Sequence, residues 1–410
     1  MKRVLIVAYY FPPLGGIGSL RIARFAEHLP AYGWEPTVLT PRNGAYFRDD
    51  TLTFPEERVL RTASIELSRA GKQLLRAGGS DTEAAAVRGA RARLKELARR
   101  HLYFPDAQIG WLPPALLSAR RRVHAGEFDA VFSSSFPITA HLIARRIHRR
   151  LGTPWVAEFR DPWSAMLPSD SPVITRAQRL EAEIGREASA LVTVSPSWAS
   201  MFGSAWSREV HVIRNGHDGV PATTSEADGR FTLGYLGTYY PGTQDLRTMW
   251  EAVRVFNSGA SGRLDAIRLI GPPQPGLLRE IADVGLSGLV EQTGFLAHDR
   301  AADELLRCSV LLVAGPKHAD PVLRGHVVAK LSEYLATQKP IIYVGQPFTD
   351  AAALISAHAG TQVVPPGDVA GAVRSITEAR DVSFVRDSDA LSRARLTAHL
   401  ADLLDEIGAR

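Results

Sequence analysis

The residues best suited to chemistry lie between Arg324 and Tyr343. This stretch begins with a glycine-containing turn, continues with a short helical pattern that carries Lys330 and Glu333, and ends in an apolar strand after Pro340. The first amides of a helix lack partners and the helix dipole is positive there, so this end of a helix can bind phosphate. A carboxylate one turn further along can accept both hydroxyls of a ribose. The spacing predicts a nucleotide site, and a helix–strand unit that only packs into the core would give the same apolar pattern.

Glycines follow the first strand of each half of the chain. Gly15 and Gly16 stand between an apolar run and a helical pattern, and Gly237 and Thr238 take the corresponding place in the second half. Glycine lets a ligand approach the backbone, and Ser19 is placed to cap the helix that follows the first pair. We expect the two pairs to face each other across a cleft. The dinucleotide motif G-x-G-x-x-G and a Walker A loop are both missing from the sequence, which disfavours an NAD enzyme and a P-loop kinase.

A further polar group ends a predicted strand of the first half. Glu158, Arg160 and Asp161 follow an apolar run, and the carboxyl ends of parallel strands form the ligand edge of a sheet. An ion pair between Arg160 and Asp161 explains this pattern equally well. Ser134 and Ser135 end the preceding strand, where small hydroxyl groups suit a polar ligand.

The composition is that of an ordinary globular protein with two domains. The chain has 410 residues, which exceeds the size at which one core keeps growing. Its hydrophobic fraction is 45%, and no apolar run approaches the ~20 residues of a membrane span. The net charge of +5 is not arranged as a basic stripe with interleaved aromatics, so we expect no nucleic-acid partner. The single cysteine, Cys308, excludes an internal disulfide, and we expect a cytoplasmic protein.

Strand-like runs alternate with helical patterns along the chain, which favours the α/β class with parallel sheets. The predicted strands are 4–9, 36–40, 130–133, 155–159, 191–194 and 210–213, then 231–237, 266–270, 290–294, 310–314, 340–344 and 362–364. Two such series predict two Rossmann-like domains that face each other across a cleft. The predicted parts are a first domain at 1–217 with a helical insertion at about 43–122, a linker at 218–229, a second domain at 230–385 and a C-terminal helix at 386–410.

The C-terminal helix is amphipathic, and we expect it to pack back toward the first domain. The only Asp-x-Asp spacing, Asp387-Ser-Asp389, falls at the start of this helix and is interpreted as a cap. We therefore expect no metal and no cofactor. Within the insertion, the arginine-rich segment 87–101 could lie on anionic lipid as a peripheral membrane contact. A solvated helix that covers the first domain explains this segment too, because it lacks aromatic anchors.

The chain resembles family 4 of the retaining nucleotide-sugar glycosyltransferases, which have the GT-B fold of two Rossmann-like domains. The resemblance runs from end to end. It is carried by Tyr10-Phe-Pro-Pro-Leu-Gly-Gly16, Pro105-Asp106 with Gly110-Trp111, Glu158-Phe-Arg-Asp-Pro-Trp163, Val194-Ser195, Asn215-Gly216 with Asp218, Gly294-Phe295, Lys330-Leu-Ser-Glu-Tyr-Leu-Ala336 and Lys339-Pro340.

The resemblance implies transfer of a sugar from a nucleoside diphosphate to an acceptor hydroxyl with retention of the anomeric configuration. UDP is the expected nucleotide, and the acceptor is a lipid-linked glycan or a small secondary metabolite. The enzyme could then work at the inner face of the membrane. The resemblance also implies residue roles: Glu333 holds the donor ribose, Val328, Ala329 and Lys330 meet the diphosphate, Gly16 approaches the phosphates from the first domain, and Phe295 and Leu296 lie beside the base.

Two departures from the family pattern concern the donor. Gly325 stands where the first motif glutamate belongs, so the sugar contact usually made there is lost or is replaced by one from Arg324, His326 or Asp320. An arginine and a lysine that commonly follow the first strand of the second domain are also missing, and the sequence reads Thr238-Tyr-Tyr-Pro-Gly there. The leaving diphosphate still needs positive charge. The candidates for that charge are Lys330, Lys317, Arg324 and Arg21.

These observations predict departure of the nucleoside diphosphate through an oxocarbenium-like state without a metal. The predicted catalytic residues are Lys330, Arg160 and Asp161. Lys330 is one candidate for the charge, and the acceptor binds near Ser134, Ser135 and Arg160, with Asp161 orienting it. Two alternatives share the fold. One is a sugar-nucleotide epimerase, and the other is a binding protein without activity, which the departures from the family pattern motivate.

Overall fold

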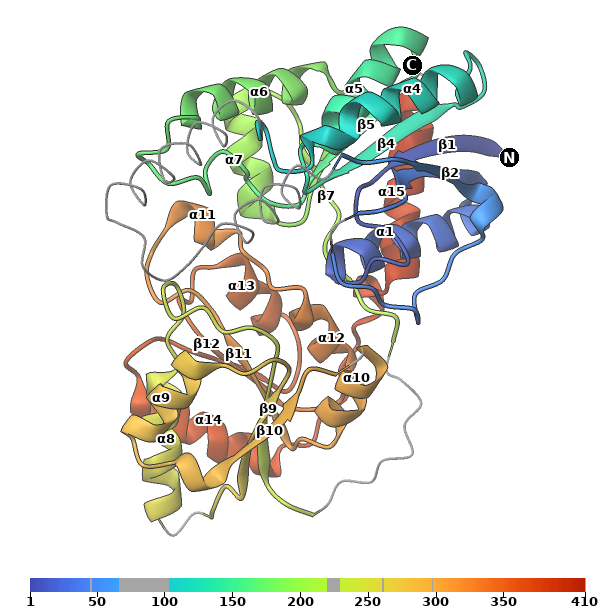
Figure 1. The fold of residues 1–410 in the computed structure, drawn as a ribbon. Coiled ribbons are helices and arrows are strands. Elements are labelled where there is room, and N and C mark those ends of the chain that lie inside the picture. Colours follow the sequence, from blue (N-terminus) through green and yellow to red (C-terminus); the bar gives the residue numbers. More distant parts are fainter. Residues whose placement is uncertain (45, 66–102, 220–228, 260–261, 297, 410) are drawn as a thin grey trace, which may run out of the picture. The chain divides into compact units, whose positions relative to one another are not determined.

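The computed structural model describes residues 1–44, 46–65, 103–219, 229–259, 262–296 and 298–409 (Figure 1). The chain forms two compact units. Unit 1 comprises Met1–Arg214 and Arg393–Arg410, and unit 2 comprises Asn215–Ser392. Each unit is built on one parallel sheet with helices on both faces, which confirms the predicted pair of Rossmann-like domains.

Unit 1 has a seven-stranded sheet in the order β3-β2-β1-β4-β5-β6-β7. Its strands are β1 Lys2–Val7, β2 Trp34–Pro41, β3 Val59–Thr62, β4 Ala130–Ser135, β5 Trp155–Phe159, β6 Ala190–Thr193 and β7 His211–Val212. The helices in the described part of this unit are α1 Ile17–His28, α4 Leu112–Arg122, α5 Thr139–Leu151, α6 Ile174–Glu187, α7 Pro196–Trp206 and α15 Arg393–Gly408.

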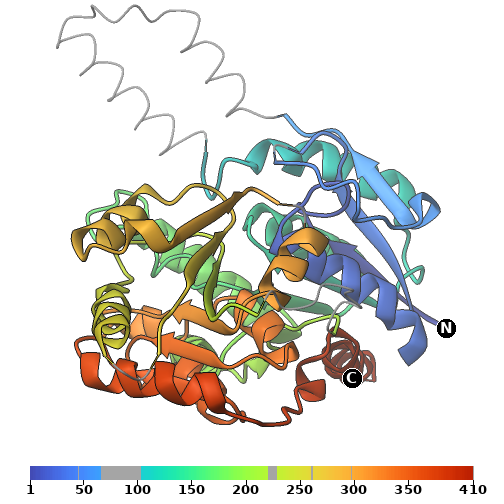
Figure 2. The same cartoon turned by 90° about the horizontal axis from the view of Figure 1, so that it is seen from below.

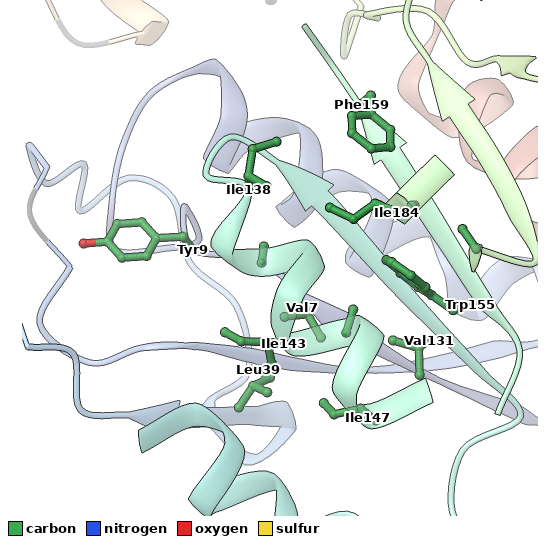
Figure 3. Close-up of a cluster of buried hydrophobic side chains, with 14 of the residues drawn as sticks. Val7, Tyr9, Leu39, Val131, Ile138, Ile143, Ile147, Trp155, Phe159 and Ile184 are labelled. Atoms are coloured by element: carbon green, nitrogen blue, oxygen red, sulfur yellow. The ribbon is translucent and has the colours of Figure 1, made fainter. Parts of the chain in front are cut away.

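The strands of unit 1 form because continuous apolar runs suit a parallel sheet that is buried on both faces. On one face, Val7, Val131 and Trp155 pack against Ile143 and Ile147 of α5 (Figure 3). The other face is covered by α1 and α15, which supply the residues Phe25, Ala26, Leu396, Leu400 and Leu404 to a second core. The C-terminal helix thus belongs to unit 1 and lies beside α1 (Figure 1).

Unit 2 has a six-stranded sheet in the order β10-β9-β8-β11-β12-β13. Its strands are β8 Thr232–Leu236, β9 Ala266–Ile270, β10 Val290–Gly294, β11 Val310–Ala314, β12 Ile341–Val344 and β13 Thr361–Val364. Its helices are α8 Arg247–Ser258, α9 Pro275–Asp283, α10 His298–Leu306, α11 Pro321–Arg324, α12 Lys330–Ala336, α13 Asp350–Ser356 and α14 Val369–Asp381.

The helices of unit 2 divide between the two faces of its sheet. Helices α8 and α14 lie side by side on one face (Figures 1 and 2), whereas α10, α12 and α13 cover the other. The strand order reverses between β8 and β11. Ligands of open parallel sheets bind outside the carboxyl ends of the strands at such a reversal. The loops after β8 and β11 are therefore the first place to look for a ligand.

Several expectations need correction. The insertion at about 43–122 is not only helical, because β3 pairs with β2 at the edge of the sheet. The C-terminal helix begins at Arg393, so Asp387 does not cap it, and its carboxylate accepts a bond from the Asp389 amide within a turn. Ser19 does not cap α1, which begins at Ile17 with Gly16 in the cap position. The segment 87–101 and linker residues 220–228 lie outside the described residues.

Candidate functional site

Lys330, the first residue of α12, reaches the end of β8. Its ammonium group donates a hydrogen bond of 2.5 Å to the carbonyl oxygen of Leu236 and lies 4.0 Å from the ring centroid of Tyr235. Burial lowers the pKa of this amine to about 7, because the charged form is poorly solvated there. An ammonium group has three donors, so the bond to Leu236 leaves hydrogens for an anion.

The same helix holds Leu236 through a second contact. Tyr334 lies one turn after Lys330, and its hydroxyl oxygen accepts a 2.8 Å bond from the Leu236 amide. Residues four apart lie on one face of a helix, so one turn of α12 binds both polar groups of a single strand-end residue. Glu333 falls in this turn and is partly exposed. The turn that carries the predicted phosphate and ribose contacts is therefore fixed to the sheet.

The loop after β8 also contributes to this edge. Gly237 has a φ of 89°, which favours glycine, and its amide donates to the Ile270 carbonyl at 2.8 Å. A Cβ atom at Gly237 would lie 3.8 Å from Nζ of Lys330, so the loop and this amine are neighbours. Thr238, the next residue, is exposed.

Two buried glutamines that sequence reasoning missed hold this loop. Gln274 accepts a bond from the Tyr239 amide at 3.0 Å, and Gln244 accepts one from the Tyr240 amide at 2.9 Å. Both glutamine residues are less than 10% exposed. No sequence signal marks them, because a glutamine in a loop is ordinary until the fold buries it.

Phe295 and Leu296, which were predicted beside a base, follow β10 at the same edge of the sheet. Gly271, after β9, donates its amide to the Gly294 carbonyl at 3.2 Å and so joins the two strand ends. Phe295 is 69% exposed, and Leu296 packs partly against the core. The Phe295 ring is thus largely open to solvent at the end of β10.

Of the predicted site residues around α11, two make hydrogen bonds to the backbone and two are exposed or partly exposed. Asp320 caps this helix and accepts bonds from the Val322 and Leu323 amides at 2.7 and 3.1 Å. Lys317 donates to the Pro241 carbonyl at 3.0 Å. Arg324 is exposed at the end of α11, and His326 two residues later is partly exposed.

In unit 1, Arg21 and Glu158 form a buried ion pair at 2.7 Å, with side chains that are 6% and 0% exposed. Arg21 also donates to the carbonyl oxygens of Ile213 and Arg214. Four of the five N–H donors of this guanidinium thus have partners inside unit 1. Arg21 was one candidate for the charge on the leaving diphosphate, and its burial overturns that assignment.

The predicted acceptor residues cluster around the same glutamate. Ser134 donates to the Glu158 carboxylate at 2.6 Å, and Ser135 donates to the Glu158 carbonyl at 3.3 Å. Both serine side chains are buried. Arg160 donates to the carbonyl oxygens of Ser135 and Phe136. The two hydroxyls therefore have partners within the domain.

Arg160 lies against the first turn of α1. A Cβ atom at Gly18 would lie 2.5 Å from its Nη1 atom, so an alanine there would displace the guanidinium group. Burial lowers the pKa of Arg160, and the carboxylates of Glu158 and Asp161 oppose this shift. Arg160 therefore lies near two carboxylates and the N-terminus of α1. A guanidinium group in such a place is suited to bind a polar group of a substrate.

The glycine loop of unit 1 has close aromatic neighbours. The Gly15 amide donates to the Phe47 carbonyl at 2.9 Å, and a Cβ atom at Gly15 would overlap the Phe47 ring. A Cβ atom at Gly16 would lie 3.0 Å from the Tyr46 ring, and Gly16 has a φ of 89°. Both glycines are thus required by local packing and backbone conformation.

The described residues form neither a metal-binding cluster nor a membrane-spanning helix. No group of three or more His, Cys, Asp or Glu side chains among them is arranged to hold a metal ion. In the same part of the chain, every helix is too short or too polar to cross a bilayer.

Residues 15–216 match a family model described as a glycosyl transferase 4-like domain. The fold is similar to that of HepE from Anabaena, solved with UDP and glucose, at 17% identity and a TM-score of 0.59 over 100% of this chain and 97% of HepE. Sucrose-phosphate synthase from Thermosynechococcus elongatus is 12% identical, with a TM-score of 0.58 over 100% and 97% of the two chains. The lipopolysaccharide outer core galactosyltransferase WaaB is 11% identical, with a TM-score of 0.57 over 99% of each chain.

No curated protein sequence matches the chain. The family match and the GT-B neighbours agree with each other and with the two parallel-sheet units. The chain therefore contains a glycosyl transferase 4-like domain at residues 15–216, and its two units have the GT-B fold of these glycosyltransferases.

Proposed function

We propose that this protein transfers a sugar from a nucleoside diphosphate sugar, with UDP as the nucleotide, to an acceptor hydroxyl with retention. The observation that carries the proposal is the position of Lys330 beside Gly237, where the strand order of unit 2 reverses. HepE has been solved with UDP-glucose, and a trehalose-6-phosphate protein of E. coli with UDP-2-fluoro glucose. These relatives of the fold support UDP as the nucleotide.

The donor is proposed to lie along the carboxyl edge of the unit 2 sheet. Phe295 and Leu296 flank the base, and Glu333 accepts the ribose hydroxyls. The amides of Val328 and Ala329 precede α12 and meet the diphosphate. This order follows the edge of the sheet from β10 to α12.

Lys330 is proposed to neutralise the diphosphate as it leaves. It replaces the arginine and lysine that the loop after β8 lacks, because its amine reaches that loop from α12. A preorganised cation aimed at developing charge stabilises the transition state without reorganising when the reaction occurs. A phosphate beside the amine would also favour its charged form.

We propose that the sugar of the donor lies near Gly325, the position at which the family motif has a glutamate. Arg324 and His326 flank this glycine, and we propose that they contact the sugar in place of the missing glutamate. Gly15 and Gly16, in the glycine loop of unit 1, are also proposed to be donor-binding residues. These contacts would distinguish the sugar that this protein accepts.

The acceptor is proposed to bind to unit 1 near Arg160 and Asp161, with Asp161 orienting the hydroxyl that attacks. Ser134 and Ser135 support this acceptor site through Glu158. Ser134 donates to the Glu158 carboxylate, Ser135 donates to the Glu158 carbonyl, and Arg160 in turn donates to the Ser135 carbonyl. The acceptor is a small molecule or a lipid-linked glycan. With the latter, the basic segment 87–101 would lie on the inner face of the membrane.

Donor turnover tests the proposal. A thermal-shift screen over nucleotide sugars selects the donor, and release of the nucleoside diphosphate is then measured with and without candidate acceptors. Release that requires an acceptor, with an α-linked product from an α-linked donor, supports a retaining transferase. Conversion of the donor alone would identify an epimerase, and binding without turnover would identify an inactive binding protein.

A further inference from the structure

We propose that Gln274 is a positioning residue for donor binding, which holds the loop 237–240 so that the Thr238 amide faces the donor diphosphate. This inference rests on the proposed function of unit 2. It concerns one loop that replaces the usual cationic segment after the first strand of this domain.

The side chain of Gln274 crosslinks three backbone segments. Its Oε1 atom accepts from the Tyr239 amide at 3.0 Å, and its Nε2 atom donates to the carbonyls of Gly237 at 3.2 Å and Pro272 at 3.0 Å. One acceptor site and both amide hydrogens are thus in use. Gln274 is 8% exposed, so solvent does not compete for these bonds.

A second buried glutamine completes the arrangement. Gln244 accepts from the Tyr240 amide at 2.9 Å and donates to the carbonyl of Ala314, at the end of β11, at 3.0 Å. The loop is therefore attached to the ends of two other strands by neutral side chains. Its shape does not depend on a bound anion.

Three of the four backbone amides of the loop 237–240 donate hydrogen bonds within unit 2. Gly237 donates to Ile270, and the amides of Tyr239 and Tyr240 donate to the two glutamines. Among the described residues, the Thr238 amide has no partner, and Thr238 is exposed. A backbone amide held in a fixed direction is a donor suited to a phosphate oxygen.

The Thr238 amide and the Lys330 amine have complementary roles. The amine lies 3.8 Å from the place of a Cβ at Gly237, the residue before Thr238. The diphosphate would thus meet one charged donor from α12 and one neutral donor from the loop. Gln274 touches neither the donor nor the reacting atoms, and it acts only through the loop.

The test compares the binding of UDP and of uridine, which lacks the phosphates, by calorimetry. Gln274→Met keeps the length of the side chain and loses all three hydrogen bonds without adding a charge. We expect UDP binding to weaken about 10-fold, the value of one hydrogen bond to a charged group, with uridine binding unchanged. The matched control is Gln338→Met, in the segment that precedes β12. The Gln338 side chain donates to the Arg386 carbonyl and accepts from the Arg386 amide.

Equal UDP affinity in Gln274→Met and wild type would overturn the inference. Equal weakening of UDP and uridine would overturn it too, since a general disturbance of the domain affects both. Should Gln274→Met not fold, Gln244→Met takes its place, with the same expected difference between UDP and uridine. A wild-type protein that binds uridine and UDP equally would contradict the donor site itself, which is a separate outcome.

Discussion

The amine of Lys330 lies 2.5 Å from the carbonyl oxygen of Leu236, which joins the first residue of α12 to the last residue of β8. These two residues are 94 positions apart, and the sheet brings them together where its strand order reverses. The amine of Lys330 therefore stands beside Gly237, in the loop that lacks the usual basic residues. The proposed donor site is built around this contact.

The affinity for UDP should depend on pH through Lys330. The amine has a pKa of about 7 in the folded protein, and a bound diphosphate would raise it. Binding then takes up a proton above pH 7, so the affinity should fall by up to about 10-fold for each pH unit. Calorimetry at pH 7, 8 and 9 measures this slope. A wild-type affinity that does not change over this range would contradict the role of the amine.

The stability of unit 2 should also depend on pH through Lys330. In the unfolded chain this amine has its ordinary pKa of 10.5, and folding lowers it to about 7. Between these values the unfolded chain binds more protons, so the free energy of unfolding should rise with pH. Below pH 7 the full cost of burying the charge is present. Lys330→Met should therefore raise the melting temperature at neutral pH and flatten this dependence, and thermal unfolding at several pH values shows whether it does.

Loss of Arg21 should destabilise unit 1. Arg21→Met leaves Glu158 as a buried, unpaired carboxylate, which should cost about 3–5 kcal/mol in the free energy of unfolding. The control is Lys2→Met, which removes the exposed ion pair with Asp405 and should cost only about 0–1 kcal/mol. Urea unfolding followed by tryptophan fluorescence measures both variants. If the two variants lost similar free energies of unfolding, the buried Arg21–Glu158 pair would contribute no more to stability than the exposed pair.

A side chain at Gly18 should impair transfer without affecting the donor site. Gly18→Ala would place a methyl group against the Arg160 guanidinium and displace it. Misplacement of a substrate-binding group should lower kcat/KM for the acceptor about 10-fold or more, with UDP binding unchanged. Gly288→Ala, at a position with open space around it, is the control. An unaffected rate in Gly18→Ala would mean that Arg160 does not serve the acceptor.

Much of the fold is predictable from the sequence because buried parallel strands are continuous apolar runs. β5, β9, β10 and β11 begin and end at the predicted residues. β3 was not predicted, because it has only four residues, one of them an arginine, and so lacks a continuous apolar run. The start of α15 is also misjudged, because the polar residues before Arg393 resemble a first helical turn and instead form a short 3-10 segment.

The site is predictable only in part, because its contacts join distant segments. The placement of Lys330 and Glu333 on one short helix follows from local pattern. The bond from Lys330 to Leu236 depends on the strand order, and the sequence does not encode that order locally. Ser134 and Ser135 looked free to meet a ligand, whereas the structure turns both toward Glu158. Gln244 and Gln274 acquire their roles only when the loops meet.

Calorimetric titration of UDP into wild type, Lys330→Met and Lys339→Met tests the central claim most directly. Lys339 lies just before β12, at the amino ends of the strands, whereas the proposed site lies at their carboxyl ends. Its loss therefore controls for the removal of one positive charge. The account predicts that Lys330→Met weakens UDP binding about 100-fold, the upper range for a hydrogen bond between charged groups, and that Lys339→Met binds like wild type. A Lys330→Met protein that folds and binds UDP as tightly as wild type would contradict it.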